Sequence, residues 1–462
     1  MKSDIIIIGG GAAGLMAAYS AAETLVKSGS SASVTVLEKM PRPARKVMIT
    51  GKGRCNFSNI KPWNDFCTHI RSKADFLKPA FYNFSSEDCL HFFESQGMPS
   101  VVERGDRAFP VSHLASDVVD TLVRACHGVG VKIVTESPVA AVAGCGEAPL
   151  TGASPLNFSS REGSSPAAFS VRLEDGREWT CSKLIIACGG LSYPGTGSTG
   201  DGYRLATGLG HSLTPLFPSL TALVPTGYKI SVKEDETRQE GCRKAIHRDT
   251  PLASLGEKLK GVQLKNVAAR LFIEGTLAQD EFGDVDFTDG GIEGPLGFQL
   301  SRKAVKAMVN GSKVVLSLDL KPAVPLEELS ARVKELWTEV DHDPRSRRLR
   351  EKEKCRILLG KLMPWELIPG FVEANPGIIT IAKSLKDWRF AIDGYVGYER
   401  CVVTAGGVCL DEVLRKTMES RLVPGLYFCG EVLDVDADTG GYNLQCAFST
   451  GRLAGQSAAA SI

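Results

Sequence analysis

Four consecutive isoleucines, Ile5 to Ile8, run directly into the turn sequence Gly9-Gly10-Gly11-Ala12-Ala13-Gly14. An unbroken β-branched run of this kind is typical of a strand that is buried on both faces of a parallel sheet. The alanine-rich stretch that follows, to about Lys27, predicts a helix, and residues 33–37 predict a second strand that ends at Glu38. Strand, glycine turn, helix and strand make one βαβ unit. We therefore expect an α/β chain with a doubly wound, Rossmann-like domain.

Gly9, Gly11 and Gly14 have the G-x-G-x-x-G spacing of a dinucleotide-binding turn. In that motif the first glycine permits a tight turn, the second lets the backbone approach a pyrophosphate, and the third lets helix and strand pack closely. The start of the helix offers free N–H groups and a partial positive charge to the phosphates. Glu38 ends the second expected strand, where a carboxylate accepts hydrogen bonds from ribose hydroxyls. These residues predict a dinucleotide site.

The far end of the chain favours FAD over NAD as that dinucleotide. Residues 426–431 (LYFCGE) predict a buried strand that ends in a glycine and a carboxylate, and residues 439–445 (TGGYNLQ) would open a helix. In an FAD domain such a carboxylate meets the ribityl hydroxyls and such a helix points its N-terminus at the flavin pyrimidine. The partial positive charge there stabilises the reduced flavin. A simple NAD domain has no use for this second half-site.

The segments between these two ends predict an interrupted domain. We expect the first part of the FAD-binding domain in residues 1–215, an inserted domain in 216–392, and the second part in 393–462. The insert combines a β-rich part, about 216–324, with a helical part, about 325–375.

One segment inside the first part carries no expected function. Residues 144–168 are rich in Gly, Ser, Pro and Ala, and they are expected to form a solvent-exposed loop.

Composition excludes several classes of protein. The 54 Lys and Arg balance 53 Asp and Glu, so the net charge of +1 gives no support for nucleic acid as a partner. The 13 cysteines and 7 histidines form no cluster with zinc-ligand spacing, so no metal site is expected. No apolar stretch near the N-terminus is long enough to span a membrane. We expect a cytoplasmic protein with free thiols, and the oligomeric state stays open.

Several motifs across nearly the whole chain resemble the BaiN-like family of NAD(P)/FAD-dependent oxidoreductases, which have a glutathione-reductase-type FAD-binding fold. The resemblance implies an FAD domain split by an insert with a β-barrel-like part and a helical part. The segments that carry it are residues 5–14, TGKGRCNFSN at 50–59, ACGGLSYP at 187–194, GSTGDG at 197–202, VTAGGV at 403–408, and the stretch from Gly430 to Phe448.

Motifs and resemblance together predict the residues that would bind FAD. They are Gly9, Gly11, Ala12, Ala13, Gly14, Glu38, Lys39, Arg45, Lys46, Gly53, Arg54, Cys55, Asn56, Val139, Gly189, Gly190, Gly430, Glu431, Gly441, Tyr442, Asn443 and Leu444.

Some of these residues have two interpretations. Lys52 and Arg54 would either neutralise the pyrophosphate or the reduced flavin, or simply keep a loop solvated. Tyr193 and Tyr442 would flank the flavin or pack against the fold. Cys55 has no second cysteine close in sequence, so a packed thiol is favoured over a redox disulfide.

Two segments of the insert carry features of their own. Where relatives in the family tend to show T-H-x-G-x-S-G-P, this chain has TDGGIEGP at residues 288–295, so acids replace a His and a Ser. A different substrate class would follow if that loop meets substrate. Residues 345–354 (RSRRLREKEK) are basic, but the interspersed glutamates and the lack of aromatics favour a solvated helix face.

The expected function is that of an FAD-dependent oxidoreductase. It would accept hydride from NADH or NADPH and pass it to a small organic substrate or to dioxygen. A second G-x-G-x-x-G between a strand and a helix is not found, so NAD(P)H would visit the open flavin face. An FAD-dependent tRNA-modifying enzyme and a non-enzymatic flavin-binding sensor are the alternatives. The sequence identifies no catalytic acid or base.

Overall fold

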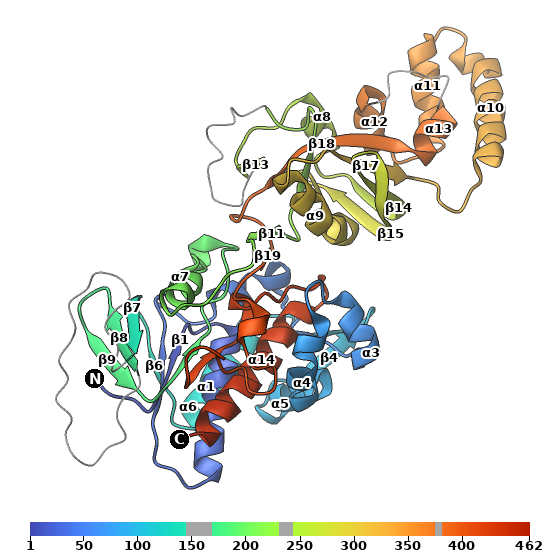
Figure 1. Cartoon of the computed structure of the whole chain (residues 1–462). Coiled ribbons are helices and arrows are strands. Elements are labelled where there is room, and N and C mark those ends of the chain that lie inside the picture. Colours follow the sequence, from blue (N-terminus) through green and yellow to red (C-terminus); the bar gives the residue numbers. More distant parts are fainter. Residues whose placement is uncertain (145–168, 231–243, 375–380) are drawn as a thin grey trace. The chain divides into compact units, whose positions relative to one another are not determined.

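The computed structural model describes residues 1–144, 169–230, 244–374 and 381–462. These residues form two compact units: Met1–Leu216 together with Val403–Ile462, called the first unit, and Phe217–Val402, called the inserted unit (Figure 1). Most of the loop expected at 144–168 lies outside the described residues.

A five-stranded parallel sheet forms the centre of the first unit, in the order β20-β10-β1-β2-β6. Four of its strands are buried almost throughout, since isoleucine, valine and leucine side chains fill both faces, whereas the edge strand β6 is partly exposed. Their bounds are β1 Ile5–Ile8, β2 Val34–Leu37, β6 Lys132–Val134, β10 Lys183–Ile186 and β20 Leu426–Phe428.

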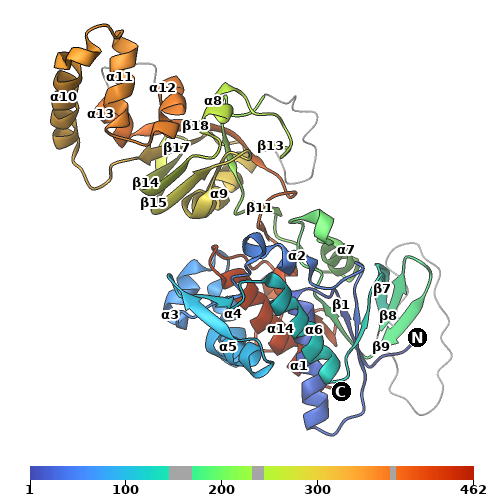
Figure 2. The ribbon, with the colours of Figure 1, turned by 180° about the vertical axis from the view of Figure 1, so that it is seen from behind.

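Helices α1 (Ala12–Lys27) and α14 (Tyr442–Ala460) lie side by side against this sheet, with α6 (Ala115–Gly128) next to α1 (Figure 2). Small residues make their close approach possible: a Cβ on Gly451 would collide with the carbonyl oxygen of Ala13, and one on Gly455 with that of Ala17. The two ends of the sequence therefore meet in one core.

Residues between β2 and β6 add short helices and a small antiparallel sheet, β3-β5-β4. The elements are α2 Arg45–Met48, η1 Thr50–Gly53, β3 Ser58–Asn59, α3 Trp63–Phe66, η2 Cys67–His69, α4 Ala74–Asn83, α5 Ser86–Ser95, β4 Ser100–Glu103, β5 Arg107–Pro110 and α6 Ala115–Gly128.

A second antiparallel sheet and one more helix complete the first unit before the chain enters the insert. These are β7 Val139–Gly144, β8 Phe169–Leu173, β9 Glu178–Cys181, η3 Pro194–Thr196 and α7 Asp201–Gly208. After the insert the chain continues with β19 Val403–Ala405, η8 Leu410–Glu412 and η9 Gly430–Val432.

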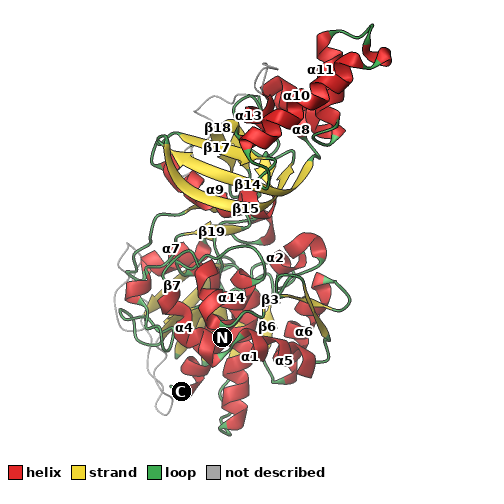
Figure 3. Ribbon diagram, turned by 90° about the vertical axis from the view of Figure 1, so that its right-hand side faces the viewer, coloured by secondary structure: helices red, strands yellow, loops and turns green. Residues whose placement is uncertain are grey.

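The inserted unit is built on a mixed sheet that closes on itself, because β12 pairs with both β16 and β18 (Figure 3). Aromatic rings of Phe287, Trp388 and Phe390 pack inside it at centroid distances of 4.6 to 6.0 Å. Its strands and associated helices are β11 Phe217–Ser219, β12 Leu223–Pro225, β13 Ala245–Ile246, α8 Ser254–Leu259, β14 Gln263–Ile273, β15 Thr276–Phe287, β16 Ile292–Glu293, α9 Gly294–Val309, β17 Val314–Asp319 and β18 Trp388–Val396.

A helical group follows β17 within the same unit (Figure 1). It contains α10 Leu326–His342, η5 Pro344–Ser346, α11 Glu351–Gly360, η6 Trp365–Leu367, α12 Ile368–Ala374 and α13 Ile381–Lys386. Among the described residues, no helix is long and apolar enough to cross a membrane.

The second boundary of the insert lies later in the chain than the expected position between residues 392 and 393. That position falls inside β18, which pairs with β17 and β12 of the inserted unit. The chain returns to the first unit at Val403. Pairing with distant strands, which the local pattern of residues 388–396 does not reveal, sets this boundary.

Candidate functional site

The three motif glycines occupy three different environments in the turn between β1 and α1. Gly9 has φ +102°, and a Cβ there would lie 2.6 Å from the carbonyl oxygen of Ala187. A Cβ on Gly14 would collide with the carbonyl oxygen of Gly9, so the helix can approach the strand only with glycine there. A Cβ on Gly11 would have no described atom within 4 Å, so the backbone of this residue faces open space.

Gly11 also serves as the N-cap of α1 without any side-chain cap, so the first N–H groups of the helix stay available. Open space in front of free N–H groups is what a pyrophosphate needs. The turn therefore fits the dinucleotide that its sequence predicts.

Glu38 lies directly under this turn. Its carboxylate accepts hydrogen bonds from the backbone N–H groups of Gly10 (2.7 Å to Oε2) and Met40 (2.7 Å to Oε1). The residue is 8% exposed, and burial raises the pKa of its carboxyl group, an effect that the two N–H groups oppose. A carboxylate oxygen can accept more than one hydrogen bond, so a ribose hydroxyl could share this carboxylate with the backbone. Glu38 is thus both a brace of the glycine turn and a candidate ribose ligand.

Three further residues of the predicted FAD set, Lys39, Arg45 and Val139, have different surroundings. Lys39 forms an ion pair with Asp201 at 2.6 Å. Arg45 is exposed at the start of α2, and this helix is attached to the glycine turn because the Ala44 N–H donates to Gly10 O at 2.8 Å. The carbonyl of Val139 accepts a hydrogen bond from Arg204 at 2.9 Å.

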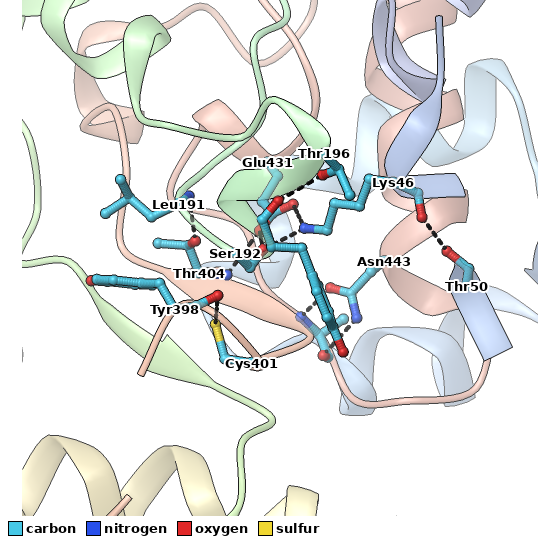
Figure 4. A network of polar contacts seen from close by, with 12 residues as sticks. Lys46, Thr50, Leu191, Ser192, Thr196, Tyr398, Cys401, Thr404, Glu431 and Asn443 are labelled. Carbon is cyan, nitrogen blue, oxygen red and sulfur yellow. Dashed lines mark hydrogen bonds and ion pairs between the residues drawn. The ribbon is translucent and has the colours of Figure 1, made fainter. Parts of the chain in front are cut away.

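Lys46 and Glu431 meet in a network that joins four segments of the first unit (Figure 4). The Lys46 ammonium pairs with Glu431 Oε2 at 2.7 Å and also donates to the Ser192 hydroxyl. Ser192 Oγ donates to Glu431 Oε1 at 2.9 Å, and the Thr404 N–H donates to the same oxygen at 2.8 Å. Thr404 Oγ1 in turn accepts the Leu191 N–H at 2.8 Å.

This network holds the carboxylate of Glu431 in one orientation next to two glycine backbones. A Cβ on Gly190 would lie 2.5 Å from Thr404 Oγ1, and one on Gly430 would lie 2.6 Å from the Cβ of Ala13. Gly189, with φ +71°, turns the chain just after β10. Close backbone approach at these positions again requires glycine.

The N-terminus of α14 forms the opposite end of the candidate site. Gly441 precedes it with φ +95° and provides no side-chain cap, so the N–H groups of Tyr442, Asn443 and Leu444 have no capping side chain. A Cβ on Gly441 would lie 2.8 Å from Asn56 Oδ1, a buried oxygen without a hydrogen-bond partner among the described residues. The side chain of Asn443 hydrogen-bonds the backbone at Ala437 and Asp438, so it braces the preceding turn.

Tyr442 is buried and packs in the fold. Its ring stacks on His69 at a centroid distance of 4.3 Å and meets Phe66 edge-on at 5.0 Å. Tyr193 is half-buried with φ +55° at the start of η3. Burial raises the pKa of the Tyr442 hydroxyl well above its usual value, and Asp438 adds to the rise.

Residues 52–56 form the end of η1 and the start of the connection to β3. Arg54 forms an ion pair with Glu103 at 2.6 Å, and its guanidinium lies 4.7 Å from the centre of the Phe109 ring. Gly53 has φ +88° and no described neighbour within 4 Å of its Cβ direction.

The Cys55 side chain in this loop is 0% exposed, and burial raises the pKa of its thiol to about 12. The thiol of Cys89 is affected by that of Cys55, although the two are distant in sequence. Burial raises the pKa of Cys89, and Asp88 and Cys55 add to the rise. Both cysteines are free.

The unusual loop at residues 288–295 uses its two acids internally. Arg400 pairs with Asp289 at 2.7 Å and with Glu293 at 3.1 Å. Burial raises the pKa of Glu293, and Arg400 opposes the rise. Asp289 and Glu293, the acids that replace a His and a Ser, therefore both pair with the Arg400 side chain.

Comparison with known proteins identifies the family. Residues 3–457 match the family described as "HI0933-like protein Rossmann domain". The chain belongs to this family. It is a family of FAD-dependent oxidoreductases with a Rossmann-like sheet and an inserted mixed sheet, as the resemblance implied.

Curated relatives of this HI0933-like chain match it from end to end. It is 31% identical to a 3-dehydro-bile acid delta(4,6)-reductase of Clostridium scindens, over 98% of both chains. It is 29% identical to ribosomal RNA dihydrouridine synthases of Haemophilus influenzae and Escherichia coli, over 97% of this chain and 96% of each relative.

Sequence reasoning missed several residues that the fold brings to these positions. Ser192 and Thr404 orient Glu431, although both lie in motif segments that carry the family resemblance. Asp438, His69 and Arg71 form a cluster beside the start of α14. Asp438 lies in the stretch from Gly430 to Phe448 that carries the family resemblance, just before the glycine turn at 440–441, whereas no sequence signal indicated His69 or Arg71.

Proposed function

We propose that this chain uses FAD and NAD(P)H to reduce a carbon–carbon double bond conjugated to a carbonyl group. One observation carries this proposal: the two kinds of curated relative, which match over nearly the full length, share that chemistry by name. A Δ4,6 double bond of a 3-dehydro-bile acid is conjugated to the 3-carbonyl, and dihydrouridine arises when the 5,6 double bond of uracil, next to its 4-carbonyl, takes up two hydrogens. The reaction fits a flavin that receives and delivers hydride.

Each part of the candidate site has a task in this proposal. The uncapped start of α1 binds the pyrophosphate, and Glu38 binds the adenosine ribose. Lys46, Ser192 and Thr404 orient Glu431 toward the ribityl chain. The uncapped start of α14 lies at the flavin pyrimidine, where its partial positive charge stabilises the negative charge of the reduced ring. When bound, FAD supplies the hydride chemistry.

Anaerobic rapid-reaction measurements test the proposal in two halves. We expect NADH or NADPH to bleach the flavin absorbance of the holoprotein, and a conjugated enone to restore it. The panel of acceptors is 2-cyclohexen-1-one, a 3-keto-Δ4 steroid, a uridine-containing RNA and dioxygen. Restoration by dioxygen alone would contradict double-bond reduction, and a flavin that neither nucleotide reduces would favour a flavin-binding sensor.

A specific observation supports RNA as a second candidate substrate. Arg345, Arg347 and Arg348 are exposed between α10 and α11 and form no ion pair with a carboxylate in the described part of the chain. The solvated helix face expected over residues 345–354 begins only at Glu351, the first residue of α11, and Glu353 pairs with Arg350. Unpaired arginines on a projecting turn suit a phosphate backbone.

RNA binding gives the test of that second candidate. Changing Arg345, Arg347 and Arg348 together to Gln is expected to weaken binding of a ribosomal RNA fragment and to lower the slope of log K against log salt by roughly 2–3. Arg332→Gln, which removes an arginine paired with Glu335, is the matched control. An RNA affinity that is equal in both variants, or absent in the unchanged protein, would leave the small organic substrate.

A further inference from the structure

Residues 69–71 lie directly against the segment that leads into α14. The Asp438 N–H donates to His69 O at 2.9 Å, and the Arg71 N–H donates to Asp436 O at 2.8 Å. Ile70 and Ala437 form the antiparallel bridge between them. This pairing brings a histidine to the start of a helix that lies some 370 positions later in the chain.

Asp438 holds one nitrogen of that histidine. His69 Nδ1 lies 3.0 Å from Asp438 Oδ2, and the aspartate side chain is 3% exposed. Arg71 binds the same carboxylate with two nitrogens, Nε at 2.6 Å from Oδ1 and a terminal nitrogen on Oδ2. A carboxylate only accepts hydrogen bonds, so Nδ1 carries a proton and donates it to Asp438.

The other nitrogen of His69 is available. Nε2 has no hydrogen-bond partner among the residues that the structure describes, and the side chain is 28% exposed. The ring lies nearly parallel to Tyr442, at an interplanar angle of 18° and a centroid distance of 4.3 Å. Since Tyr442 is the first residue of α14, the imidazole has a fixed place beside the helix start where we put the flavin pyrimidine.

We propose that His69 is the proton donor of the reaction, with Asp438 as its positioning residue. This inference rests on the proposed reduction of a conjugated double bond. The double bond takes up hydride from the reduced flavin at its β-carbon and a proton at its α-carbon. That proton leaves Nε2 of the imidazolium as the new C–H bond forms, and the neutral ring regains a proton from solvent. One substrate is reduced and one flavin oxidised in each turnover.

The geometry differs from that of a simple structural clamp. Arg71 alone already satisfies both oxygens of Asp438 and links the two segments. His69 adds a single hydrogen bond and leaves Nε2 without a partner among the described residues. A structural clamp does not need a free nitrogen, but a general acid does, and its hydrogen-bond partner at the other nitrogen fixes the tautomer.

Two acceptors of different chemistry separate proton transfer from structure. We expect His69→Gln to slow the oxidation of reduced holoprotein by 2-cyclohexen-1-one by about 100-fold or more. The rate of oxidation by ferricyanide should change by no more than about twofold, because ferricyanide accepts electrons without protonation of a carbon. That change is well below the roughly 10²-fold that a general acid contributes. His91→Gln, on the exposed side of α5, is the control for both. Equal loss with both acceptors, or no loss with the enone, would overturn the assignment.

Nitrogen-15 NMR of the unchanged holoprotein gives a readout that needs no turnover. The neutral ring of His69 is expected as the Nδ1–H tautomer, with Nε2 the nitrogen that gains and loses the proton. A neutral Nε2–H tautomer would overturn the inference even if the enone is reduced. An unchanged protein that reduces no enone would contradict the proposed function instead, and the tautomer would still decide whether His69 has the form of a proton donor.

Discussion

Glu38 braces the glycine turn and is also the proposed ribose ligand. Because its carboxylate accepts the Gly10 and Met40 N–H groups, Glu38→Ala removes support from the apoprotein as well as the proposed ribose ligand. We expect FAD affinity to fall about ten- to a hundredfold, since a hydrogen bond to a charged group contributes roughly 1.5–3 kcal/mol. Titration of apoprotein with FAD measures this. An unchanged affinity would refute Glu38 as a ribose ligand.

The burial of Glu38 also predicts a pH effect on the apoprotein. Burial raises the pKa of the carboxyl group in the folded chain. At a pH between the unfolded and the folded pKa values, the folded chain therefore keeps a proton that the unfolded chain has lost. The free energy of unfolding contributed by this group therefore falls as pH rises from about 4.5 through the raised pKa, by about 1.4 kcal/mol for each unit between the two values. Glu38→Gln cannot ionise, so urea unfolding should show a shallower decline over that window. A parallel decline in both proteins would contradict the shift.

The thiol of Cys55 is expected to be chemically silent. It is buried, and its pKa of about 12 keeps it protonated at neutral pH. Native holoprotein at pH 8 should leave Cys55 unmodified by iodoacetamide, as peptide mass spectrometry will show, while the unfolded protein is alkylated. Cys55→Ser should change anaerobic flavin reduction by NAD(P)H less than tenfold, that is by less than about 1.4 kcal/mol. A larger loss with FAD still bound would place the thiol in the chemistry.

Between elements, the contact of α1 with α14 depends on two glycines. Gly451→Ala would drive a methyl group into the carbonyl oxygen of Ala13, so we expect a loss of about 1–3 kcal/mol in unfolding free energy from overpacking. Gly128→Ala, in α6 with no atom within 4 Å of the new Cβ, is the matched control and should be neutral or slightly stabilising. Chemical unfolding of the apoproteins compares them. A neutral Gly451→Ala would mean that the helices separate readily.

At the scale of the whole molecule, the predicted cofactor residues from both ends of the sequence lie in the first unit. In the proposed function the glycine turn and Glu38 would bind the adenosine half of the dinucleotide, and Glu431 and the start of α14 would bind the flavin half. The denatured protein should therefore release FAD and not FMN. Chromatography of the released flavin checks this, and recovery of FMN would contradict the assignment of the N-terminal turn.

Local patterns in the sequence were sufficient to predict the core strands of the first unit and the position of the glycine turn. Ile5 to Ile8 form β1, the helix follows at Ala12, and the strand expected within residues 426–431 is β20. Such segments report their own environment, because a strand buried on both faces must be apolar throughout and a tight turn must contain glycine.

Only the tertiary structure decided which side chains meet. Lys46 reaches Glu431 across 385 positions, His69 reaches Asp438 across 369, and the closed sheet of the insert depends on the pairing of β12 with β18. None of these contacts can be recognised from a local sequence pattern. Each polar side chain, taken alone, would be equally compatible with a solvent-exposed position. Charged and polar partners are selected by the approach of distant backbones, and that approach is set by the packing of the apolar segments between them.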